Sequence, residues 1–84
     1  MLRPTYCLVR NLGRGNREYE FAEFETPLSD AHAELLQREL RAAVTNDLTL
    51  ETVEAVDIAL ARFEAETHIR GRVVDDPFPA SIEF

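Results

Sequence analysis

Residues 29–67 read SDAHAELLQRELRAAVTNDLTLETVEAVDIALARFEAET, a stretch with the pattern of two consecutive amphipathic helices. At its start, the Ser29 hydroxyl can accept a hydrogen bond from the free amides of a first helical turn. Asp30 adds a negative charge at the positive end of the helix dipole. Apolar residues then recur at steps of three and four, at Ala33, Leu36, Leu40 and Ala43. The pattern predicts a first helix that begins at Ser29.

A second helix is predicted after residues 45–47, whose polar side chains compete for backbone hydrogen bonds. We expect it to begin at Thr49, with Leu48 and Val53 placed to form a hydrophobic staple. Its apolar stripe consists of Val53, Val56, Leu60 and Phe63. The short connection predicts antiparallel neighbours. The expected contact between them is a seam of Leu36, Leu40, Val56, Leu60 and Phe63.

Strands are expected on both sides of the helices. Residues 5–12 and 17–25 combine β-branched and aromatic residues, and the intervening GRGN predicts a hairpin. In the second of these segments Tyr19 and Phe21 share one face while Phe24 has the opposite parity. Either a bulge near residues 22–23 returns Phe24 to the core, which we favour, or Phe24 faces outward near the end of the strand. Residues 68–74 predict a third strand, and residues 75–84 a loop followed by a tail or a short edge strand.

The predicted element order is strand, strand, helix, helix, strand, within one small domain of residues 1–84. This order favours an α+β fold, with an antiparallel sheet of three to four strands and the antiparallel helical hairpin packed on one face. The other face of the sheet would be exposed to solvent and would carry Glu18 and Glu20. A chain of this size buries only about 60–65 per cent of its unfolded surface, so its stability margin is expected to be thin.

The charge and the cysteine content exclude several function classes. A net charge of −7 argues against general affinity for nucleic acid or for an anionic membrane. The longest apolar runs are too short to cross a bilayer. The single cysteine, Cys7, cannot form an internal disulfide and is expected to be a buried structural thiol. With no leader pattern at the start, we expect a cytoplasmic protein.

Acidic side chains are the broadest functional signal in the chain. A dense negative surface steers toward basic partners, although solubility alone would explain it equally well. The residues predicted to form an acidic, partner-binding face are Glu18, Glu20, Glu23, Glu51, Glu54 and Asp57.

Apolar residues outside the seam are the second group of candidates. Leu35 and Ile58 either cover the sheet or form an interface with a partner or with a second copy in a homodimer. Phe78 lies between two prolines that stiffen the backbone. It is either presented to a partner or folded back onto the core.

Two alternatives rest on other residues. Arg10, Arg14 and Arg17 surround the predicted turn and could bind phosphates, as in a nucleic-acid-binding regulator. Cross-strand pairing with glutamates is the simpler explanation. His32 and His68 lie at helix ends that a hairpin brings together, as in a small metal-binding protein or enzyme. Without metal-ligand spacing, two independent surface histidines are the simpler explanation.

These observations favour a non-enzymatic interaction module over an enzyme. No catalytic motif, phosphate loop or metal-ligand spacing is present, so we predict no catalytic residues and no cofactor. We expect a small inhibitor that covers a basic site, of the kind that binds nucleic acid, on a larger protein. The class includes phage-encoded anti-defence proteins, immunity proteins and antitoxins.

Overall fold

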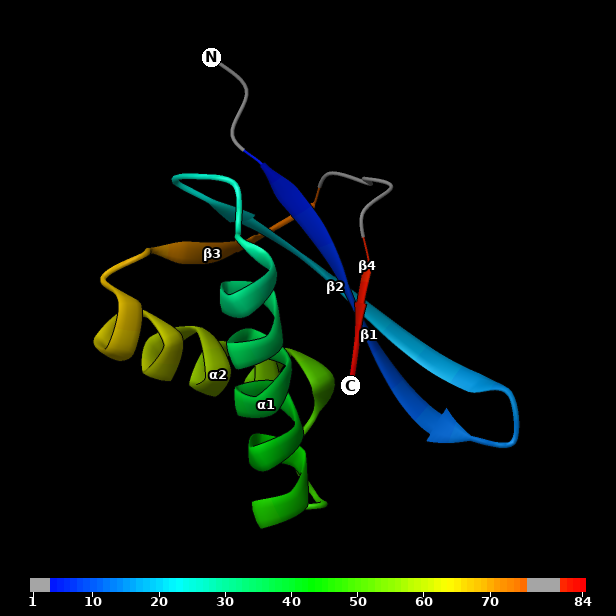
Figure 1. The fold of residues 1–84 in the computed structure, drawn as a ribbon. Helices are drawn as coiled ribbons and strands as arrows, with labels where there is room; N and C mark the ends of the chain where they lie inside the picture. Colours follow the sequence, from blue (N-terminus) through cyan, green and yellow to red (C-terminus); the bar gives the residue numbers. More distant parts are fainter. Residues whose placement is uncertain (1–3, 76–80) are drawn as a thin grey trace.

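The computed structural model describes residues 4–75 and 81–84. It has two long strands, two helices and two short strands (Figure 1). In chain order these are β1 (Thr5–Gly13), β2 (Asn16–Phe24), α1 (Asp30–Asn46), α2 (Thr52–Thr67), β3 (Gly71–Val74) and β4 (Ser81–Glu83). The α+β class and the order β-β-α-α-β are therefore confirmed, and the C-terminal residues form a short edge strand. No helix in these described ranges is long and apolar enough to span a membrane.

The sheet has the strand order β3-β2-β1-β4 and is mixed. Strand β2 is antiparallel to both β1 and β3. Strand β4 is parallel to β1, with Cys7 opposite Ser81 and Val9 opposite Glu83. The prediction of a purely antiparallel sheet is wrong in this respect. Strand β4 does not pair next to β3. It lies at the opposite edge of the sheet, beside β1, and runs in the same direction as β1.

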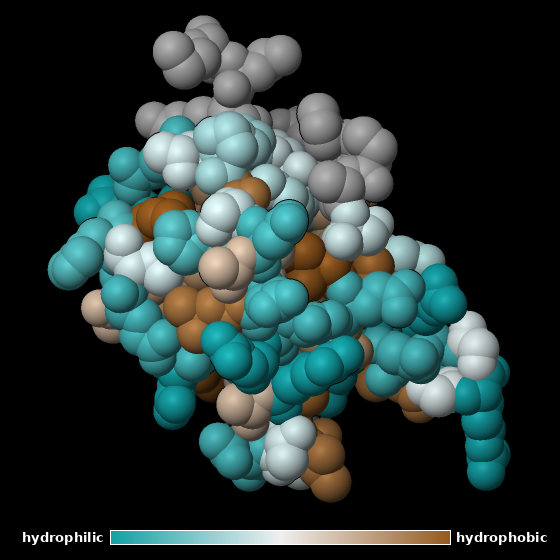
Figure 2. All heavy atoms as spheres, viewed as in Figure 1, coloured by the Kyte–Doolittle hydropathy of each residue, from teal (hydrophilic) through white to brown (hydrophobic). Residues whose placement is uncertain are grey.

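Both helices cover the same face of the sheet, and Figure 1 shows them crossing in front of it. The core between the layers includes the whole predicted seam, since Leu36, Leu40, Val56, Leu60 and Phe63 are buried. The sheet contributes Leu8, Ala22, Phe24 and Ile82 to the same cluster. In the view of Figure 2, hydrophobic residues reach the surface only in small separate patches. The apolar stripes of the helices are thus largely used for folding.

Strand β2 turns the opposite face toward the helices from the one that was predicted. Its pairing with β1 is regular from Glu23 to Arg17, and the irregularity falls between residues 11 and 13. No bulge therefore lies near residues 22–23. Phe24 is 1% exposed and packs edge to face on Phe63, with ring centroids 5.8 Å apart. Tyr19 is 56% exposed.

This orientation moves Glu18 and Glu20 to the helix-covered side of the sheet, because side chains alternate along a strand. The prediction that they lie on the solvent-exposed face, opposite to the helices, is wrong. On that opposite face Cys7 is buried, as predicted. Burial raises the pKa of the Cys7 thiol, so the reactive thiolate is disfavoured.

The β1–β2 hairpin closes through a two-residue turn, since Gly13 pairs with Asn16. Arg14 and Gly15 both have positive φ, 55° and 78°. Two successive positive φ values are the signature of a type I′ turn, which matches the right-handed twist of the strands. The GRGN segment therefore forms the predicted hairpin, and it extends beyond the helices in Figure 1.

The observed start of α1 agrees with the start predicted from the sequence, and the observed start of α2 differs from the predicted one. Ser29 caps α1, and its Oγ accepts from the His32 amide at 3.1 Å. The cap of α2 is Glu51, which forms a capping box with Glu54. The predicted start at Thr49 is wrong, and Leu48 is too exposed to form a staple. The Thr49 amide and hydroxyl instead donate to Asp47 Oδ1, which lowers the pKa of Asp47.

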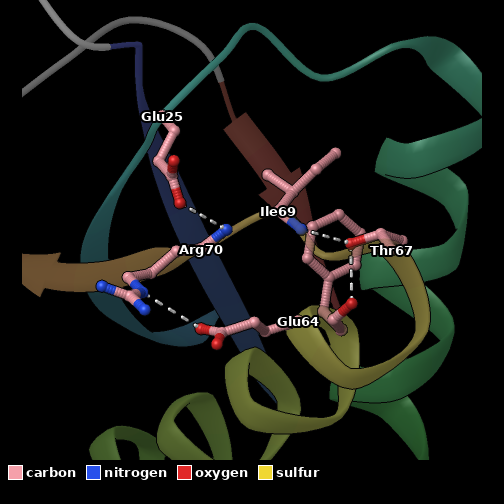
Figure 3. Close-up of polar contacts among 6 residues, drawn as sticks. Glu25, Glu64, Thr67, Ile69 and Arg70 are labelled. Atoms are coloured by element: carbon pink, nitrogen blue, oxygen red, sulfur yellow. Dashed lines mark hydrogen bonds and ion pairs between the residues drawn. The ribbon is translucent and has the colours of Figure 1, made fainter.

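The junction between α2 and β3 is held by local polar contacts, drawn in Figure 3. The Thr67 hydroxyl donates to the Phe63 carbonyl at 2.7 Å and accepts from the Ile69 amide at 3.1 Å. The Arg70 amide donates to Glu25 at 3.2 Å. At Gly71 a Cβ would lie 2.7 Å from Phe24 Cδ1, so β3 packs closely on the core. This junction places the end of β3 beside the middle of β2.

Candidate functional site

A cleft with a volume of about 590 Å³ lies between strand β2 and the segment that leads into α2. Its lining combines charged, polar and apolar residues from two regions that are far apart in the sequence. These are Arg10, Glu18, Tyr19, Glu20, Thr49, Leu50, Glu51, Thr52 and Val53. The β-hairpin and the connection between the helices together make this the candidate functional site.

Arg10 anchors the two walls of the cleft to each other. It is only 8% exposed, and its Nη1 donates to the Leu50 carbonyl at 2.7 Å and lies 3.4 Å from Thr52 Oγ1. The Thr52 hydroxyl in turn donates to Glu18, which is the cross-strand neighbour of Arg10. A buried cation is costly unless its donors are satisfied. Arg10 is therefore a structural member of the site.

The charges of three carboxylates, from β2, α2 and the residue after β3, act on Glu20, and of these four acids Glu18 and Glu20 line the cleft. We name Glu18, Glu20, Asp57 and Asp75 the acidic cluster. The pKa of Glu20 is raised, first by burial and then by the negative charges of Asp57, Asp75 and Glu18. In the described ranges, the ion pairs join Arg17 to Glu83, Arg70 to Glu64 and Arg72 to Glu23. None of them neutralises a member of the cluster.

The structure divides the six acids that the sequence placed on one face. Glu18, Glu20 and Asp57 belong to the acidic cluster, and Glu51 lines the cleft together with Glu18 and Glu20. Glu54 completes the capping box of α2 by accepting from the Glu51 amide at 2.9 Å. Glu23 lies on the opposite face of β2, where Arg72 donates to it at 2.6 Å. The predicted acidic face is thus brought together only in part.

Asp75 is a member of the cluster that sequence reasoning did not assign to the acidic face. Val74 pairs with Phe21 in the antiparallel β2–β3 ladder. Asp75 directly follows this last pair of the ladder, and its negative charge acts on Glu20. Strand register was the only signal that could have placed it there, and the sequence does not specify how β3 pairs.

The apolar candidates have different positions. Leu35 packs against the core cluster, which supports the simpler explanation that it covers the sheet. Ile58 is 38% exposed on α2 and remains available at the surface. Tyr19 and Val53 are also exposed and line the cleft. Phe78 lies outside the described residues.

The three arginines around the hairpin do not act as one group. Arg10 is buried and bonded to Leu50, so it is not free to bind a phosphate. Arg17 lies 3.9 Å from Glu83, a distance at the limit of an ion pair, and both side chains are exposed. Arg14 occupies the turn. The nucleic-acid alternative is left with Arg14 and Arg17.

The two histidines have separate surroundings. The ring of His32 packs edge to face on Phe63, with centroids 6.1 Å apart. His68 ends α2 with φ 61° and lines a smaller cleft of about 320 Å³ beside Glu64 and Arg70. Among the residues that the structure describes, no three histidine, cysteine or acidic side chains are grouped so that they could hold a metal ion. The metal alternative therefore gains no support here.

The acidic cluster predicts a stability that depends on pH. The pKa of Glu20 is higher in the folded protein than its ordinary value of 4.5, so the folded state binds the proton more tightly. This carboxylate therefore destabilises the fold at neutral pH, and stability rises as pH falls through the folded pKa. We expect Glu20→Gln to raise the melting temperature at pH 7 by about 2–4 °C.

Thermal unfolding at several pH values tests this expectation. The gain should disappear below about pH 4, where Glu20 is protonated in both states. Glu39→Gln is the matched control, because it removes one negative charge from the middle of α1, away from both helix ends. An equal gain from Glu39→Gln would show that net charge alone is responsible.

Comparison of the chain with models of protein families, with curated proteins and with solved structures found no match.

Proposed function

We propose that this chain is a small, non-enzymatic inhibitor that binds a basic site on a larger protein through the cleft and its acidic cluster. The basic site would be of the kind that normally binds nucleic acid. Phage-encoded anti-defence proteins, immunity proteins and antitoxins belong to this functional class. A small domain with a net charge of −7 can compete for such a site by presenting carboxylates in place of phosphates.

The observation that carries the proposal is the cleft itself, which is lined by the carboxylates of Glu18, Glu20 and Glu51. The pKa of Glu20 is raised, first by burial and then by the negative charges of Asp57, Asp75 and Glu18, so negative charge from several parts of the chain acts on this one position. Like charges in proximity destabilise a fold, and the ion pairs of the described residues lie elsewhere. A basic partner would relieve this repulsion on binding. Solubility alone requires dispersed charge and does not require such a cluster.

Exposed apolar side chains beside the cluster give the proposed interface an anchor. Val53 is 36% exposed and lines the cleft. Tyr19 is 56% exposed and borders the cleft at the edge of β2, with its ring on the opposite face of the strand from Glu18 and Glu20. Aromatic residues are enriched at the energetic centres of interfaces because they contribute a large contact area with few rotatable bonds. The surrounding carboxylates would direct the approach of the partner and set its charge preference.

Affinity capture from an extract of the source organism tests the proposal. The wild-type chain should retain a protein that binds nucleic acid, and should inhibit that binding when the two are purified and mixed. A variant with Glu18→Gln, Glu20→Gln and Asp57→Asn should lose retention about tenfold or more, because it removes most of the charge complementarity.

The matched control carries Glu34→Gln, Glu39→Gln and Glu66→Gln, which remove the same charge from other parts of the helices. This control should retain the partner with an affinity within about threefold of wild type, apart from a general effect of net charge. Equal losses in the two triple variants, or a retained protein without affinity for nucleic acid, would contradict the proposal.

A further inference from the structure

Strand β2 has a free edge beyond the end of β3. It spans Asn16–Phe24, but β3 pairs only with Phe21–Phe24. On the side away from β1, residues 17–20 therefore have no strand partner in the described part of the chain. This unpaired part of the β2 edge borders the cleft. An unpaired strand edge is a template for the addition of another strand.

The backbone groups available at this edge belong to Arg17 and Tyr19. The Phe24 amide donates toward β1, to the Pro4 carbonyl, at 2.8 Å. The Glu25 amide donates in the opposite direction, to Arg70 at 3.3 Å, on the side of β3. Because these directions alternate along a strand, Arg17 and Tyr19 direct both N–H and C=O away from β1.

Side chains beside the edge specify the chemistry of an added strand. Glu18 and Glu20 line the cleft on the helix-covered face, and Tyr19 has the opposite parity. We infer that this edge binds an extended segment of a protein partner as an added β-strand, with basic side chains alternating toward the cleft and an apolar side chain beside Tyr19. This inference rests on the proposed function and specifies its mode of binding.

A second copy of this chain fits the edge poorly. Directly opposed residues of paired strands project to the same face of the sheet. In a symmetric antiparallel pairing, Glu18 would therefore face Glu18 or Glu20 of the other copy. Like charges directly opposite destabilise a pair of strands. Charge complementarity thus selects a basic segment over self-association.

A synthetic peptide of eight alternating arginine and valine residues tests the edge directly. The peptide can pair with β2 so that its arginine side chains lie beside Glu18 and Glu20. In this register its valine side chains lie on the same face as Tyr19, and the valine amides point toward β2. We expect binding, observed by NMR titration, and slower hydrogen exchange at the amides of Arg17 and Tyr19. The amides of Glu18 and Glu20 already point toward β1 and should change little.

Two N-methylated forms of the peptide separate strand addition from charge attraction. Methyl groups on the valine amides should weaken binding about tenfold or more, because they block hydrogen bonds to β2. The same number of methyl groups on the arginine amides, which would face solvent, should weaken it less than about threefold. Equal binding of the two forms, or no slowing of exchange at Arg17 and Tyr19, would overturn the inference.

Variants of the whole chain distinguish failure of this inference from failure of the proposed function. Tyr19→Pro removes the outward amide at an edge position that tolerates proline, whereas Tyr19→Ala removes only the ring. Tyr19→Pro should weaken binding of the captured partner at least about fivefold more than Tyr19→Ala. If the cluster variant loses the partner and Tyr19→Pro keeps it, the proposed function stands without strand addition.

Discussion

Replacement of Phe24 with alanine is expected to lower the free energy of unfolding by about 3–5 kcal/mol. A domain of this length has a total stability on the order of 5–10 kcal/mol, so a large part of it would be lost. Phe24 is 1% exposed and packs edge to face on both Tyr6 and Phe63. Removal of its ring leaves a cavity where both helices and the sheet meet. Urea denaturation followed by circular dichroism measures the loss.

Phe21→Ala is the matched control for this prediction. Phe21 lies on the same strand but faces away from the helices, and it is only partly buried. Its loss should cost about 1–2 kcal/mol. The two variants thus discriminate between the two possible orientations of β2. A larger loss for Phe21→Ala than for Phe24→Ala would show that β2 has the opposite face toward the core.

Replacement of Arg10 with methionine is expected to cost about 1.5–3 kcal/mol. Methionine keeps an apolar stem of similar length but cannot donate to Leu50 or to Thr52. The Leu50 carbonyl then loses its charged donor in a partly buried position. The thermal midpoint should fall by about 6 °C or more. Amide hydrogen exchange should also speed up at the start of α2, because Arg10 ties this segment to β1.

Arg14→Met provides the comparison for the Arg10 variant. Arg14 lies in the exposed turn and already has a positive φ of 55°, so the substitution leaves backbone strain nearly unchanged. A surface change of this kind should alter stability by less than about 0.5 kcal/mol. Similar losses for the two variants would show that Arg10 does not anchor the cleft.

Local signals in the sequence were sufficient for most of the secondary structure. Ser29 is predictable as a cap because its hydroxyl serves the first turn of its own helix. The GRGN turn is predictable because a tight hairpin requires positive φ. The start of α2 is ambiguous in the sequence because Thr49 and Glu51 both offer an oxygen to a helix start. Only the observed geometry shows that Asp47 engages Thr49 while Glu51 caps the helix.

The candidate site was only partly predictable. Charge alone predicts a shared role for Glu18, Glu20 and Asp57, and in the structure Glu18 and Asp57 both act electrostatically on Glu20. Glu23 has the same charge but the opposite parity on β2, where it meets Arg72. The sequence does not separate Arg10 from the turn arginines, because spacing along the chain does not indicate burial. Its partners are 40 and 42 residues away.

The sequence by itself determined the elements, their order and the apolar seam of the helices, because caps, turns and helical periodicity act over a few residues. Tertiary structure alone decided which face of β2 is buried, that β4 runs parallel to β1, and which carboxylates share the cleft. Alternation along β2 is compatible with either face, and only packing against Phe63 selects the face that carries Phe24. That choice also turned Glu18 and Glu20 toward α2, and so created the acidic cluster.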